Sequence, residues 1–156
     1  MLEEIGICVE EKFRGLVDED WARRITQQVL KAEGVAPPYE VSIVFTDSKT
    51  VQRLNRDYRG VDEPTDVLAF STREEIGVDL PPFVQPPDGV LHLGEVVISY
   101  PQAVIQSEEH QHSVKREIAI LIIHGVLHLL GYEHDKLELE SQMRAREAEI
   151  LSYIEG

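Results

Sequence analysis

Residues 118 to 135 read IAILIIHGVLHLLGYEHD, and they decide the fold because they combine an apolar helix with three histidines. His124 and His128 are four residues apart, a spacing that places two side chains on one helix face with Cβ atoms about 5–6 Å apart. Gly131 follows the last apolar turn, where glycine ends a helix because it enters the left-handed conformation without a Cβ penalty. The chain reversal would bring His134 beneath the other two. We therefore predict three zinc ligands with a fourth position open, as in catalytic zinc sites.

The apolar character of this helix supports the metal interpretation. The segment from Ile118 to Leu130 is apolar almost all round, so we expect its two histidines to be buried. Buried imidazoles cost free energy unless a partner satisfies them. Any one of these histidines alone would more often be a hydrogen-bonded core residue, but the three together favour a zinc ion.

The spacing H-x-x-x-H-x-x-G-x-x-H is that of metzincin proteases, with one difference. Gly125 occupies the position of the catalytic glutamate, which takes the proton from zinc-bound water in those enzymes. Its loss makes peptide hydrolysis a weak interpretation. Zinc alone can still lower the pKa of its bound water to about 7 or polarise a phosphoryl oxygen.

Length and composition indicate one soluble domain, residues 1–156, with 42% hydrophobic and 28% charged residues. A single cysteine, Cys8, excludes an internal disulfide framework and fits a reducing compartment; we interpret it as a core residue. The N-terminus carries acids where an export signal needs a basic start. The most apolar run, about thirteen residues, is shorter than the roughly twenty that span a bilayer, so we expect no membrane association.

The formal net charge of −14 argues against broad adhesion to nucleic acid, because polyanion affinity comes mainly from lysine and arginine. Any RNA site must be local. Arg53, Arg56, Arg59 and Arg73 flank one region, where a bound zinc ion would add positive charge, although most of them could equally be solvated surface residues.

Hydrophobic periodicity and turn residues predict alternating strands and helices. The expected strands are Glu4–Glu10, Tyr39–Phe45, Val67–Phe70 and Leu93–Ser99, with a proline-rich surface excursion at Thr72–His92 before the last of them. The expected helices run from Asp18 or Asp20 to about Glu33, from near Asp47 to near Tyr58, from Tyr100, and through the histidine segment that Ser113 caps. A last amphipathic helix is expected at Lys136–Glu155, with Leu139, Met143, Ile150 and Ile154 on its buried face. This pattern indicates one sheet covered by helices, either α/β or α+β.

Three segments together carry a resemblance to a known family. LNRDYRGVDEPTDVLAF, LGEVVIS and HGVLHLLGYEHD resemble, in this order, the YbeY family of bacterial ribosomal-RNA maturation factors, which are zinc-dependent single-strand endoribonucleases. The resemblance covers most of the chain from Val41 onward. It implies an α+β fold, a mixed four-stranded sheet with about five or six helices.

The resemblance also implies the site and the setting. It makes His124, His128 and His134 the ligands of one zinc ion per chain, and Arg59 the catalytic or phosphate-binding arginine. It implies a cytoplasmic protein acting on single-stranded RNA, at the 3′ end of small-subunit rRNA and in ribosome quality control, with ribosomal proteins or an assembly GTPase as further partners.

Two other functions are compatible with the same residues. One is a noncatalytic ribosome-assembly factor with a structural zinc, and the other is a metal-dependent hydrolase of another substrate.

His110 and His112, in EEHQHS, form a second metal candidate, but two histidines in a short acidic loop are more often exposed side chains.

Overall fold

The computed structural model describes residues 3–63, 65–71, 90–131 and 144–152. Its elements in chain order are β1 (Glu3–Val9), the 3-10 helix η1 (Glu11–Phe13), α1 (Glu19–Ala32), β2 (Tyr39–Thr46), α2 (Ser48–Arg59), β3 (Val67–Ser71), β4 (Leu91–Ser99), α4 (Tyr100–Glu109), α5 (Val114–Leu129) and a helical segment at residues 144–152. No described helix is both long and apolar enough to cross a membrane.

The four strands form one mixed sheet in the order β1-β2-β4-β3. β2 runs parallel to both β1 and β4, and the edge strand β3 pairs antiparallel with β4. Helices follow or precede these strands along the chain, as the periodicity predicts. The fold is therefore α+β with a mixed four-stranded sheet, which confirms the expectation from the sequence.

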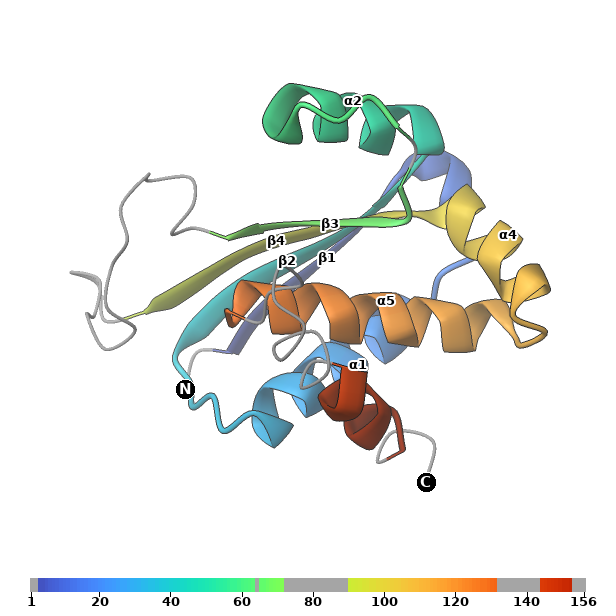
Figure 1. Ribbon diagram of the computed structural model, residues 1–156. Helices are drawn as coiled ribbons and strands as arrows, with labels where there is room; N and C mark the ends of the chain where they lie inside the picture. The colour runs from blue at the N-terminus through green and yellow to red at the C-terminus, as the bar shows by residue number, and fades with distance from the viewer. Residues whose placement is uncertain (1–2, 64, 72–89, 132–143, 153–156) are drawn as a thin grey trace.

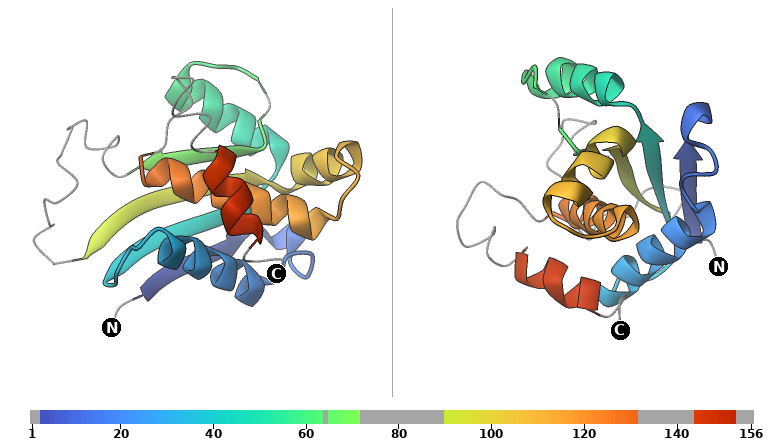
Figure 2. Two further views of the ribbon diagram at one scale, coloured as in Figure 1. Left: turned by 60° about the horizontal axis from the view of Figure 1, so that its bottom comes forward. Right: turned by 90° about the vertical axis from the view of Figure 1, so that its right-hand side faces the viewer.

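Helices cover the two faces of the sheet unequally. α2 lies on one face, while α1 and α5 lie on the other with the 144–152 segment beside them (Figures 1 and 2). The larger core fills the space between the sheet and α1 and α5, where Ile43, Val96 and Ile122 are fully buried. A smaller core beneath α2 is formed by Val51, Leu68 and Val97. α5 is thus held against the sheet along its length.

Side-chain caps fix where the helices begin. The N-cap residues that accept a backbone N–H are Asp18 from Trp21 (3.0 Å), Asp47 from Thr50 (2.7 Å), Ser99 from Gln102 (3.2 Å) and Ser113 from Arg116 (3.1 Å). Each cap satisfies one of the N–H groups that a helix leaves without an internal partner. The cap predicted at Ser113 is confirmed, α1 uses Asp18 of the two candidates Asp18 and Asp20, and α2 begins after Asp47, near the predicted start.

The prediction that Cys8 is a core residue is wrong, because its side chain is exposed. Successive side chains of a strand point to opposite faces. Ile5 of β1 is buried, so Cys8, three residues later, points to the other face. α2 covers that face over β3 and β4, and β1 lies at the opposite edge of the sheet.

Two other predictions fall partly outside the described residues. The proline-rich excursion was predicted at Thr72–His92, and its residues 72–89 lie outside the described part of the chain. The end of the excursion was placed too late, because β4 begins at Leu91, two residues earlier than predicted. Backbone pairing of Leu91 with Tyr39 extends the strand although its side chain is partly exposed. Of the last predicted helix, residues 144–152 are helical and Ile150 is buried, whereas 136–143 lie outside the described residues.

Candidate metal centre

α5 presents two histidines on an otherwise buried stretch. Between Leu121 and Leu129, all of which the structure describes, every residue is buried except His124 and His128. Their ring centroids lie 4.7 Å apart with the ring planes at 67°. The predicted juxtaposition is therefore confirmed, but the expected full burial is not: the His124 side chain is 25% exposed. Partial exposure gives an ion or a substrate access to the pair.

A carboxylate holds the first of these rings. His124 Nδ1 lies 2.7 Å from Glu147 Oε1, on the 144–152 helical segment. An ionised carboxylate can only accept a hydrogen bond, so in this contact Nδ1 is the donor. This is how metal-binding histidines are commonly oriented, with one nitrogen toward a carboxylate and the other toward the ion.

The position of Glu147 is itself fixed by two neighbours on the same segment. Ile150, three residues later, is 1% exposed in the core. Arg146 donates from Nε to Glu33 Oε2 at 2.5 Å, joining the segment to the end of α1. The hydrogen bond to the Glu33 carboxylate raises the pKa of the Arg146 guanidinium, so Arg146 remains a cation. Sequence reasoning missed Glu147, although its place on the inner stripe, three residues before Ile150, was a usable signal.

Gly125 has a packing reason to lack a side chain. A Cβ on this residue would meet both methyl groups of Val96 on β4, one of them well inside van der Waals contact. Val96 is fully buried and, being β-branched, cannot rotate away easily. The position that holds a general base in metzincins is therefore occupied by the helix–sheet contact, which leaves no room for a glutamate.

Arg59 is the last residue of α2, and the chain turns immediately after it. Gly60 caps the helix in the left-handed conformation (φ 72°). Just before it, the ring of Tyr58 meets Phe70 of β3 edge-on, with centroids 5.4 Å apart. The C-terminal ends of α2 and α5 point toward the same end of the sheet, and the two helices lie on its opposite faces (Figure 1). The side chain of Arg59, like the whole of His134, lies outside what the structure describes.

A second group of metal-binding side chains lies at the other end of α5. His110, His112 and Glu117 place one ligand atom each within 4.8 Å of one another, and they could hold a metal ion. His110 is exposed, as the sequence predicted, but the side chain of His112 is 19% exposed and that of Glu117 only 2%. Both histidine rings contact the Glu117 carboxylate, a pairing that sequence reasoning missed.

A cavity of about 150 Å³ lies near this end of the helix, between the loop that precedes α1, the start of α1 and the first residues of α4 and α5. Trp21, Tyr100 and Ile118 are among the residues that line it. Ile118 precedes His128 by ten residues, or about 15 Å of helix. The cavity is therefore separate from the paired histidines.

Comparison with known proteins gives a consistent result. The family model described as "Endoribonuclease YbeY" matches residues 9–155. A Dehalococcoides mccartyi protein named endoribonuclease YbeY is 44% identical over 154 residues, covering 97% of this chain and 90% of the relative. A protein of the same name from Chloroflexus aurantiacus is 44% identical and covers 99% of this chain and 97% of its own. Another, from Moorella thermoacetica, is 48% identical and covers 83% of this chain and 81% of its own.

The fold has a counterpart among solved structures. The solution structure of TM1509 from Thermotoga maritima matches with a TM-score of 0.56 and covers 97% of this chain and 91% of its own. At 21% identity, this likeness shows a shared fold. The match of the family model, extending over nearly the whole chain, and the relatives above 40% identity show that the chain belongs to the endoribonuclease YbeY family.

Proposed function

We propose that this protein is a zinc-dependent endoribonuclease that cuts single-stranded RNA, and that it acts at the 3′ end of small-subunit rRNA and in ribosome quality control. The observation that carries the proposal is the pair His124 and His128, partly exposed on a buried helix and oriented by Glu147. Membership of the endoribonuclease YbeY family supports RNA as the substrate. A role in rRNA maturation would place the protein in the cytoplasm.

The donor set of the proposed centre fits zinc. Neutral imidazole is among the preferred ligands of this ion, and a carboxylate in contact with one ring nitrogen, as Glu147 is with Nδ1 of His124, is the usual neighbour of a metal-binding histidine. His134, three residues after Gly131, would complete a set of three. When bound, zinc supplies Lewis-acid polarisation of a phosphoryl oxygen and acidifies water near neutral pH.

Arg59 is the residue that we propose for the phosphate. Its guanidinium has planar donors that match two phosphate oxygens at once and remains charged at any working pH. Arg59 would bind the phosphodiester and offset the negative charge that develops on phosphorus. With a formal net charge of −14 for the chain, a local cation of this kind would be needed to hold a polyanion.

A second function is kept because of the contact between His124 and Glu147. If Glu147 turned to ligate zinc, the fourth position would be occupied and the ion would be structural. The protein would then act as a noncatalytic assembly factor that docks on ribosomal proteins or an assembly GTPase. A peptidase is disfavoured, because Val96 packs where the catalytic glutamate would stand.

The experiment replaces His128 by alanine and Arg59 by glutamate, and measures bound zinc and cleavage of a single-stranded RNA oligonucleotide. We expect His128→Ala to lose the zinc ion of this centre together with cleavage, and Arg59→Glu to keep that ion and lose cleavage. Arg53→Glu is the matched control, because Arg53 lies on the same helix, is exposed, and would receive the same charge change. Full cleavage by both test variants would refute the nuclease and leave the assembly factor.

A further inference from the structure

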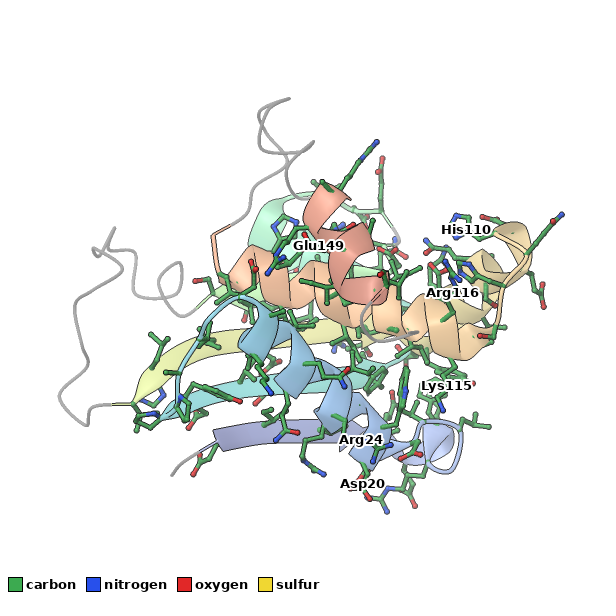
Figure 3. The ribbon with its side chains drawn as sticks, turned by 90° about the horizontal axis from the view of Figure 1, so that it is seen from below. Asp20, Arg24, His110, Lys115, Arg116 and Glu149 are labelled. Carbon is green, nitrogen blue, oxygen red and sulfur yellow. The ribbon has the colours of Figure 1, made fainter. Side chains whose placement is uncertain are left out.

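We propose that His110, His112 and Glu117 form a second metal site, which binds a divalent transition-metal ion such as Zn²⁺ and joins α4 to α5. The site does not depend on the proposed nuclease centre. Glu117 precedes His128 by eleven residues on α5, which corresponds to about 16 Å of helix. Figure 3 shows His110 at the α4 end of this helix, near Arg116.

The ligand atoms converge on one point. His110 Nδ1 lies 3.2 Å from Glu117 Oε2, and His112 Nε2 contacts the same oxygen even more closely. The two ring centroids are 5.5 Å apart, tilted by 58°. Two ligands on one tetrahedral zinc ion, each about 2.0–2.2 Å from the metal, are separated by about 3.3 Å. The His110 contact already has this separation, the His112 contact is shorter, and all three ligand atoms lie within 4.8 Å of one another, so movements of the two rings would admit the ion.

The backbone between the helices holds the two rings in place without the metal. His110 is the C-cap of α4, and its N–H donates to Gln106. Gln111 has a φ of 57°, a left-handed conformation that reverses the chain between the histidines. The N–H of His112 then donates to the carbonyl of Ser107 at 3.0 Å. Such a preformed turn lowers the ordering cost of binding an ion.

Burial and charge favour a cation at this point. The Glu117 side chain is 2% exposed, and a buried carboxylate is retained in proteins when it is paired or coordinates a metal. Glu108 and Glu109, the two residues before His110, are exposed and add negative charge to this part of the chain. The exposed ring of His110 leaves one side open to solvent, where a water molecule would complete a fourfold coordination.

The alternative is that no metal binds, and that protons on the two histidine rings alone balance the negative charge of the Glu117 carboxylate. Both arrangements satisfy the carboxylate, but they differ in what they bind. A metal site takes up an ion and releases protons, whereas a hydrogen-bonded group has no affinity for the ion. Metal binding to the folded chain would also raise its melting temperature, because the ion would join the end of α4 to the first turn of α5.

The experiment counts zinc ions on the full chain. Metal-free protein is titrated with Zn²⁺ in competition with a coloured zinc chelator, for the wild type and for His110→Ala, Glu117→Gln and His128→Ala. We expect two ions on the wild type and one on each variant. His110→Ala should weaken the second site by at least about tenfold. Its exposed position makes loss of folding a poor explanation of that result.

His92→Ala is the matched control, since His92 Nδ1 also contacts a carboxylate, Glu40, at 3.4 Å on the surface. It should bind two ions, and circular dichroism should show all variants folded. The proposal is overturned if His110→Ala and wild type bind the same number of ions with the same affinities. An ion lost only in His128→Ala would overturn this site and leave the proposed nuclease centre intact.

Discussion

His124 and His128 could be predicted as a pair because their spacing depends on helix geometry alone. Their partial exposure could not be predicted, since it depends on which face of α5 the sheet covers. Glu147 is 23 residues from His124 along the chain, and only the packing of Ile150 and the link from Arg146 to α1 bring its carboxylate to the ring. Contacts of this kind are set by tertiary structure.

Replacing Glu147 by glutamine tests whether its carboxylate orients His124. We expect zinc affinity at the paired histidines to fall by about 10- to 100-fold, because the neutral amide holds the ring less firmly and makes the imidazole a less basic ligand. Competition with a zinc chelator measures the change. Glu149→Gln on the same segment is the control, since Glu149 instead pairs with Arg146 at 3.0 Å. Equal affinities for the two variants would remove this role from Glu147.

Gly125 shows how one helix depends on the sheet beneath it. The sequence predicted only the chemical consequence of this glycine, the missing general base. The structure adds the cause: α5 approaches β4 so closely that a Cβ would collide with Val96. Sequence periodicity indicates which face of a helix is buried but not how close the partner strand lies, so this reason could not have been predicted.

Gly125→Ala should therefore destabilise the protein by about 1–3 kcal/mol, as overpacked core substitutions do, even though alanine favours helix formation. Urea unfolding followed by circular dichroism measures the change. In the background of Val96→Ala, which opens the space, the same substitution should cost less. A stabilised Gly125→Ala protein would mean that the contact with Val96 is easily relieved.

Asp47 gives the start of α2 a dependence on pH. The hydrogen bond from the Thr50 backbone N–H, helped by the Thr50 side chain and by Lys12, lowers the pKa of Asp47 from 3.8 to about 2. A carboxyl whose pKa is lower in the folded state stabilises the fold above its unfolded pKa. This contribution is lost as the pH falls from 3.8 toward about 2.

Asp47→Asn should consequently lower the free energy of unfolding by about 1 kcal/mol at neutral pH. The difference from wild type should shrink as the pH falls below 3.8 and should vanish only once the pH is below the folded pKa of about 2. Chemical unfolding at a series of pH values measures it. Asp57→Asn, an exposed carboxylate on the same helix, serves as the control. A difference that stays constant with pH would show that the charge of Asp47 contributes nothing.

The overall architecture was predictable in kind and only partly in detail. Alternating helices and strands indicated a helix-covered sheet, and the family resemblance implied its four mixed strands. The order β1-β2-β4-β3 and the uncovered face of β1 follow from tertiary packing, which is why Cys8 was wrongly expected in the core. The cluster of His110, His112 and Glu117 was underestimated because its buried member lies on a different element from the two histidines.

Zinc held by the α5 histidines should be required for RNA cleavage. The most direct test is cleavage of a single-stranded RNA oligonucleotide by metal-free wild type and metal-free His128→Ala, each before and after addition of Zn²⁺. His128→Ala retains His110, His112 and Glu117, so any effect of that cluster is the same in both proteins. Added zinc should restore cleavage to the wild type and not to His128→Ala. Cleavage by the metal-free wild type at its full rate, or equal restoration in both proteins, would contradict this requirement for zinc.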